Sequence, residues 1–175
     1  RKEPFLISFF YQSLIHDSDR SCYYIPFAFF THAVCLASCY TNVDKIIIAL
    51  SKFNYKNWEL NIYGDGASRK SLEELTYSLG CNEKIHFFGN VSRDEVVEAM
   101  NSSHIFIMIS KNEIFGLVYL EAMAASCITI ASKLGGIDGI IENNKNGFLC
   151  KEGDSLELEN IINYIFSLND EEIKK

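Results

Sequence analysis

The stretch from Lys111 to Leu149 reads KNEIFGLVYLEAMAASCITIASKLGGIDGIIENNKNGFL and decides the fold and the expected site. Two carboxylates, Glu113 and Glu121, stand eight positions apart, with an apolar turn and a predicted helix start at Gly116 between them. A carboxylate can accept both hydroxyls of an adjacent pair on a sugar. A helix N-terminus offers backbone N–H groups and a favourable dipole to a diphosphate. The stretch therefore predicts a site for a nucleotide sugar.

Outward from this stretch, the chain alternates strand and helix patterns. Continuous apolar runs, alternation of apolar and polar residues, and apolar residues at a 3.6-residue period indicate the order of strands and helices. Strands are expected at 33–39, 58–63, 84–88, 104–109, 127–131 and 147–149, and helices from Asn42 or Asp44 to Phe53 and at 68–79, from the cap Ser92, 116–126 and 155–168. This order predicts an α/β fold with a Rossmann-like doubly wound parallel sheet.

Sheets of this kind bind ligands beyond the carboxyl ends of their strands. Four short segments follow predicted strands and are expected to meet at that edge. They are Gly64–Gly66, Gly89–Val91, Ser110–Gly116 and Gly135–Gly136. The spacing alone places them together.

Five blocks in one order resemble the C-terminal, donor-binding half of retaining GT-B glycosyltransferases with an E-x(7)-E motif, the glycosyl transferases group 1. The resemblance covers residues 33–166 and rests on NVDKIIIALSKF, NIYGDGASRKSLEELTYSLG, KIHFFGNVSRDEV, the Glu113–Glu121 block and GGIDGIIENNKNGFL. It implies a GT-B fold of which this chain is the C-terminal half. An N-terminal acceptor domain of similar size is not in this sequence.

The resemblance also implies roles for individual residues. Glu121 would hold the ribose hydroxyls, and Glu113 would act catalytically on the transferred sugar. The backbone around the helix start would meet the phosphates and the sugar, and the turn after the 84–88 strand would seat the base. The remaining donor-binding residues are then Phe115, Gly116, Leu117 and Val118, with Gly89, Asn90 and Val91, and, as a weaker case, Gly64 and Gly66.

Each of these residues also has a purely structural interpretation. Glu121 suits an exposed or ion-paired helix position, and Glu113 suits a solvated loop. Phe115 and Leu117 fit simple core packing, which would leave the N–H role intact. Gly89 fits a left-handed turn, and the Gly64–Gly66 segment fits an ordinary one.

The sequence departs from the family pattern at the phosphate-binding positions. The family usually carries an Arg and a Lys between the first strand and the next helix, whereas here Thr41 stands in the place of the Lys. The two phosphate charges would then have no Arg or Lys partner, unless Lys133, Lys111 or Arg93 supplies the cation. Ser126 and Ile128 replace a common Gly and Pro, and Gly139 replaces a usual acid.

The composition argues against several other classes of protein. The 175 residues carry a net charge of −7, which argues against a nucleic-acid partner. The six cysteines lack C-x-x-C or zinc-type spacing, so we expect reduced, mostly buried thiols and no metal. The chain opens at Arg1 without a signal peptide, which favours a cytoplasmic fragment of a longer protein.

Residues 1–32 form an aromatic-rich segment or connector ahead of the nucleotide-sugar-binding domain, 33–175. No charged residue occurs between Arg20 and Asp44, a length that spans a bilayer, but Pro26 and several polar residues interrupt it. We therefore expect a connector, with peripheral contact at the inner face of the membrane and a true membrane anchor as open alternatives.

The sequence thus predicts the donor-binding domain of a hexosyltransferase acting without a metal cofactor in polysaccharide biosynthesis. It would help transfer a hexose from a nucleoside diphosphate sugar to a glycan or lipid-linked acceptor, and would be incomplete or weakly active alone. The alternatives are a degenerate, non-catalytic nucleotide-sugar-binding or scaffolding module, and a membrane-associated subunit.

Overall fold

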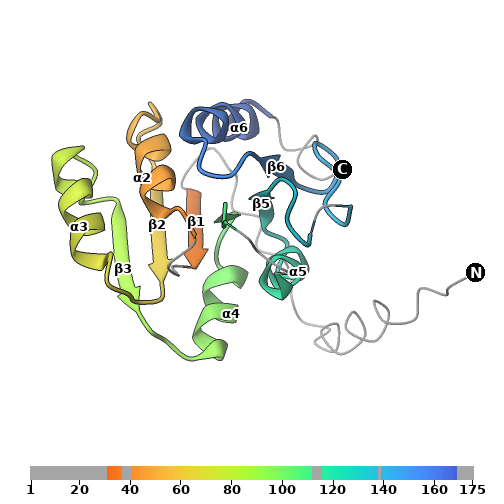
Figure 1. Cartoon of the computed structure of the whole chain (residues 1–175), viewed down its shortest axis with the longest axis horizontal. Coiled ribbons are helices and arrows are strands. Elements are labelled where there is room, and N and C mark those ends of the chain that lie inside the picture. The colour runs from red at the N-terminus through yellow and green to blue at the C-terminus, as the bar shows by residue number, and fades with distance from the viewer. Residues whose placement is uncertain (1–30, 37–40, 112–115, 138, 169–175) are drawn as a thin grey trace, which may run out of the picture.

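The computed structural model describes residues 31–36, 41–111, 116–137 and 139–168. The described elements follow one another as strand and helix throughout (Figure 1). They are β1 (Thr31–Leu36), α2 (Val43–Ser51), β2 (Trp58–Tyr63), α3 (Arg69–Ser78), β3 (Ile85–Gly89), α4 (Arg93–Asn101), β4 (Ile105–Met108), α5 (Leu117–Ala124), β5 (Ile128–Ser132), β6 (Phe148–Cys150) and α6 (Ser155–Ser167).

The six strands form one sheet in the order β3-β2-β1-β4-β5-β6, and every neighbouring pair is parallel. The predicted doubly wound parallel sheet is therefore confirmed. The chain moves outward from β1 to β3, then returns to the other side of β1 at β4. The direction of winding reverses between β1 and β4, and sheets of this kind bind ligands beyond the strand ends at that point.

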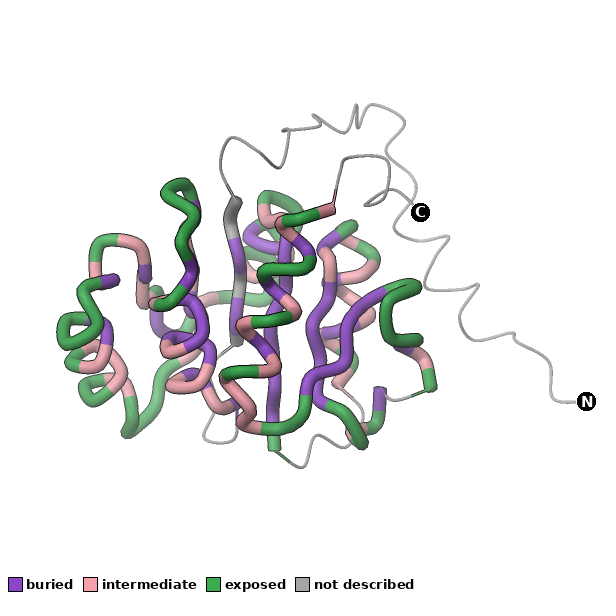
Figure 2. The backbone as a smooth tube through the Cα atoms, turned by 90° about the horizontal axis from the view of Figure 1, so that it is seen from above, coloured by how far each residue is buried: buried purple, intermediate pink, exposed green. Residues whose placement is uncertain are grey.

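Side-chain alternation along the strands divides the core into two layers. Ile105 and Ile107 of β4 pack in one cluster with α2 and α6, while Phe106 and Met108 pack in the other with Tyr119 of α5. Figure 1 accordingly shows α2 and α6 towards the top of the view and α4 and α5 towards the bottom. In Figure 2 the buried backbone lies along the central strands, with exposed residues on the outer surfaces of the helices.

Burial on both faces explains the continuous apolar runs. All four residues of β4 are buried, as expected for a strand covered by helices on both sides. Cys81, Cys127 and Cys150 are free and buried, which confirms the predicted reduced thiols at those three positions, and Cys35 is buried as well. Cys22 and Cys39 lie outside the described residues.

Two further predictions depend on segments outside the description. The connector and the uncharged stretch ahead of Asp44 fall mostly within residues 1–30 and 37–40. Among the helices of the described residues, none has the length and apolar character needed to cross a bilayer.

Candidate functional site

The N-terminus of α5 lies at the carboxyl edge of the sheet. Gly116 occupies the N-cap position with φ 65° and ψ 57°, a left-handed conformation that favours glycine, and supplies no side-chain cap. The first N–H groups of a helix have no acceptor inside the helix. Those of Leu117 and Val118 are therefore suitable donors for a phosphate. Glu113 and Phe115 lie outside the described residues.

In the first turn of α5, one side chain is exposed and the next two pack against the core. Leu117 is 63% exposed, so the alternative interpretation of Leu117 as a core residue is wrong. Val118 is half-buried and packs with Tyr119 in the cluster beneath α5. The Tyr119 hydroxyl donates to the carbonyl oxygen of Met108 at 2.8 Å and fixes the first turn of α5 onto β4.

Glu121 lies one turn into α5 and is ion-paired. Its Oε1 accepts from Nη2 of Arg93, the first residue of α4. The Glu121 side chain is 32% exposed and that of Arg93 is 77% exposed, so the pair lies open to solvent. The ion-pair alternative for Glu121 is therefore present in this structure, and one carboxylate oxygen remains for another partner.

The turn after β3 is fixed by its backbone. Gly89 has φ 72°, and a Cβ atom there would lie 3.1 Å from Nη1 of Arg69. The positive φ favours glycine here, and a side chain would also require the Arg69 guanidinium to shift slightly. Asn90 is exposed, whereas Val91 packs against the same hydrophobic cluster as Val118. The structure thus brings Val91 and Val118 into the same cluster.

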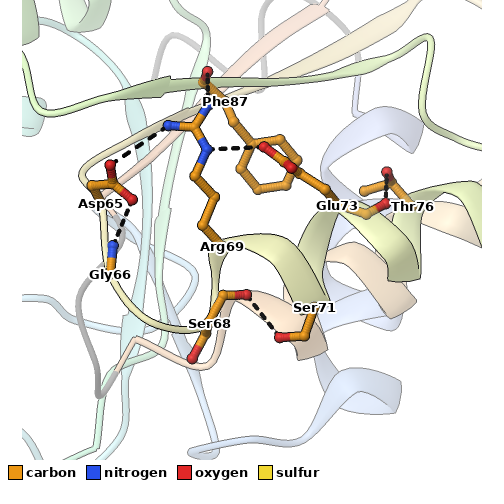
Figure 3. A network of polar contacts seen from close by, with 8 residues as sticks. All are labelled: Asp65, Gly66, Ser68, Arg69, Ser71, Glu73, Thr76 and Phe87. Carbon is orange, nitrogen blue, oxygen red and sulfur yellow. Dashed lines mark hydrogen bonds and ion pairs between the residues drawn. The ribbon is translucent and has the colours of Figure 1, made fainter.

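Both glycine N–H groups of the segment Gly64–Gly66 are already paired. The Gly64 N–H donates to the carbonyl of Gly89 at 2.7 Å. The Gly66 N–H donates to Oδ1 of Asp65 at 2.8 Å (Figure 3). Arg69, which lies 3.8 Å from the Asp65 carboxylate, donates to Glu73 and to the carbonyl of Phe87. Neither glycine N–H is free for a ligand in this conformation, which supports the ordinary-turn interpretation.

Three cations were predicted as possible replacements for the family's phosphate-binding Arg and Lys. They differ in exposure and in ion pairing. Arg93 is paired with Glu121, and Lys133, directly after β5, is paired with Glu157 of α6. Lys111 is exposed just beyond β4. Thr41, in the place of the family Lys, is buried.

Sequence reasoning missed two features at this edge. Phe88 is half-exposed and stacks on Tyr63, with ring centroids 4.8 Å apart and planes 10° from parallel. Burial, and then the charges of Glu95 and Glu98, raise the pKa of the Tyr63 phenol, which keeps it neutral. The adjacency of β2 and β3 creates this pair, and two aromatic residues at the ends of consecutive strands were its sequence signal.

The second missed feature is Asn42. It stands at the N-cap position of α2 in the left-handed region, with φ 51°, and makes no side-chain cap. Its Nδ2 instead donates to the carbonyl of Ile109 at 2.7 Å. Asn42 is therefore the N-cap residue of α2, one of the two predicted starts, but its amide joins this helix to the segment after β4 instead of capping it.

The described residues hold no group of three or more His, Cys, Asp and Glu side chains arranged for a metal ion. Loop N–H groups, one carboxylate and an exposed aromatic ring therefore make up the described site. Such groups suit an anionic ligand that also carries hydroxyls and a flat ring system.

Comparison with known proteins gives a consistent assignment. Residues 37–175 match the family model of Glycosyl transferases group 1. The N-acetyl-alpha-D-glucosaminyl L-malate synthase of Bacillus anthracis is 34% identical over 97 residues, which are 55% of this chain and 25% of that protein.

Two solved structures share the fold over most of the described chain. A glycosyltransferase from Rickettsia africae matches with a TM-score of 0.76 and 27% identity, covering 83% of this chain and 40% of that one. Anabaena Alr3699/HepE, solved in complex with UDP and glucose, matches with a TM-score of 0.73 and 25% identity, over 82% and 40%.

The sequence therefore spans about a quarter of that curated relative and two fifths of those solved chains. The matched structures are GT-B glycosyltransferases, which confirms the predicted relationship. The chain belongs to the Glycosyl transferases group 1 family and has the fold of one part of a GT-B glycosyltransferase.

Proposed function

We propose that this chain binds the nucleoside diphosphate sugar from which a larger glycosyltransferase transfers a hexose. One observation carries the proposal. The N-terminus of α5, where the N-cap Gly116 offers no side chain, and the carboxylate of Glu121 lie together on α5, at the edge of the sheet where its winding reverses.

The chemical parts of the donor match the parts of the site. The diphosphate would lie on the N–H groups of Leu117 and Val118, where the helix dipole favours negative charge. The ribose hydroxyls would bind the Glu121 carboxylate, and the base would lie near Gly89 and Val91. The UDP complex of the Anabaena relative supports a uracil base.

The finer roles rest on family membership. Glu113 would contact the transferred hexose, and reaction with retention at the anomeric carbon would need no metal ion. The glycan or lipid-linked acceptor would enter between this domain and the second part of a complete enzyme. The family match favours this transferase over a non-catalytic scaffolding module.

Calorimetric titration of UDP, GDP and ADP into the chain tests the proposal. One nucleotide should bind saturably, Glu121→Ala should abolish that binding, and a chelator should leave it unchanged. Glu74→Ala is the matched control, because Glu74 is an exposed glutamate on α3, away from this edge. Absence of binding by all three nucleotides, or equal binding by the Glu121 and Glu74 variants, would refute the proposed donor site.

A further inference from the structure

Ser110 carries a buried hydroxyl without a hydrogen bond. The residue lies two positions beyond β4 and is 3% exposed. Its Oγ has no hydrogen-bond partner in the part of the chain that the structure describes. Most buried polar groups in proteins are paired, and an unpaired one lowers stability. Such a group in a folded protein requires an explanation.

The backbone around this hydroxyl is already fixed. The carbonyl oxygen of Ser110 accepts from the Ser132 hydroxyl at 2.7 Å, and that of Ile109 accepts from the Asn42 amide at 2.7 Å. The last residue of β5 and the N-cap residue of α2 thus satisfy these two carbonyls. The Ser110 hydroxyl remains unpaired, although its surroundings are well ordered by hydrogen bonds.

Strand alternation places the hydroxyl on the side of α5. Phe106 and Met108 belong to the cluster under α5, while Ile107 and Ile109 belong to the opposite cluster. Ser110 continues the first series. The Tyr119 hydroxyl holds α5 to the carbonyl of Met108, two residues earlier. This alternation, continued two residues past the end of β4, places Ser110 on the side of the sheet that α5 covers.

We propose that the Ser110 hydroxyl donates a hydrogen bond to a phosphate oxygen of the bound nucleoside diphosphate, beside the N–H groups of α5. This inference rests on the proposed function. A hydroxyl can donate or accept, but beside several N–H donors and a positive helix end its favourable partner is an anion. The phosphate would complete the pairing that the ligand-free chain lacks, and would partly replace the absent Arg and Lys.

Ser110→Ala separates this role from a structural one, because its two effects have opposite signs. The ligand-free variant should unfold at the same or a higher temperature than wild type, since the unpaired group is removed. Its affinity for UDP, or for the nucleotide that binds best, should fall about tenfold, as expected for a lost hydrogen bond to a charged group. Its affinity for the corresponding nucleoside, which lacks phosphate, should stay unchanged.

Two variants complete the experiment. Ser132→Ala is the matched control, because that buried hydroxyl is paired, and its loss should lower the unfolding temperature. Ser110→Cys keeps the side-chain shape with a weak donor and should lose diphosphate affinity as Ser110→Ala does.

The outcomes distinguish the two proposals. Wild-type binding of UDP that Ser110→Ala retains in full would overturn the Ser110 role alone. A fall in unfolding temperature for Ser110→Ala equal to that of Ser132→Ala, with nucleoside and nucleotide binding equally affected, would also overturn it. Absence of nucleotide binding by the wild type would overturn both the donor site and this inference.

Discussion

The guanidinium of Arg93, at the start of α4, is paired with the carboxylate of Glu121 in α5. The pair joins two helices on the same side of the sheet, at the position where the ribose of a donor is expected. A diol that binds both carboxylate oxygens must first displace Arg93. At the proposed donor site, Arg93 would therefore compete with the ribose for Glu121.

Removing that competitor should strengthen nucleoside binding. Arg93→Ala should bind the preferred nucleoside about twofold to fivefold more tightly, because an exposed ion pair contributes up to about 1 kcal/mol. Titration calorimetry measures the change, and Arg93→Lys should resemble wild type. Weaker nucleoside binding by Arg93→Ala would show that Arg93 contacts the ligand rather than competing with it.

At position 42, protein stability should depend on the chemistry of the side chain rather than on its size. Asn42→Asp loses the donor and points a carboxylate oxygen at the Ile109 carbonyl, so we expect a loss of about 1–3 kcal/mol in unfolding free energy. Asn42→Gly also loses the bond but relieves the left-handed backbone, and should lose less. Denaturant titration measures both, and equal losses would argue against the bridging role.

Replacing Ser126 with glycine should stabilise the protein. It follows the C-cap of α5 with φ 64°, and the next N–H, of Cys127, donates to Ala122 at 3.0 Å, as in a Schellman motif. Ser126→Gly should raise the unfolding free energy by about 1 kcal/mol, because a side chain is strained in this conformation. Thermal or denaturant unfolding measures the gain.

Gly80 provides the reciprocal control at the end of α3. It has φ 68° in the same motif, and open space surrounds the position of a Cβ atom. Gly80→Ser should therefore destabilise the chain by about the amount that Ser126→Gly stabilises it. A neutral result at both positions would remove backbone strain as the explanation.

Glu157 should make the stability of the protein depend on pH in the acidic range. Burial raises the pKa of this carboxyl, but hydrogen bonds from Lys133 and the Lys151 N–H outweigh it, and the net pKa lies below the ordinary 4.5. A lowered folded-state pKa stabilises above the unfolded value, and that contribution is lost as pH falls through the folded-state pKa. Unfolding temperature measured from pH 7 to pH 3 should therefore fall more steeply for wild type than for Glu157→Gln. Parallel curves would contradict the assignment.

Local chemistry explains why many elements could be predicted. The capping box at Ser92 and Glu95 involves residues three apart, and the structure shows both of its hydrogen bonds. The α3 stop at Gly80 and the bounds of β2 likewise follow from nearby residues. These features depend on neighbours that the sequence displays directly.

The features that could not be predicted depend on neighbours across the fold. β1 begins at Thr31 rather than at residue 33, because its first residues pair with Trp58 and Glu59 of β2. Only the packing of α4 against α5 places Arg93 beside Glu121. For the same reason, the sequence indicated Ser110 only as one member of a loop, whereas the structure shows its hydroxyl buried without a partner among the described residues.

The strand order has a consequence for how the molecule opens. The chain up to α4 builds β1, β2 and β3, and the chain from β4 onward builds the other three strands, so β1 and β4 form a seam between consecutive halves. Their recorded register comprises two residue pairs, Ala33 with Ile105 and Val34 with Phe106. We expect each half to open as one unit in hydrogen exchange, although α2 of the first half packs with α6 of the second. A nucleotide held by Gly89 on one side and Glu121 on the other would link the units, and amide hydrogen exchange would slow in both together.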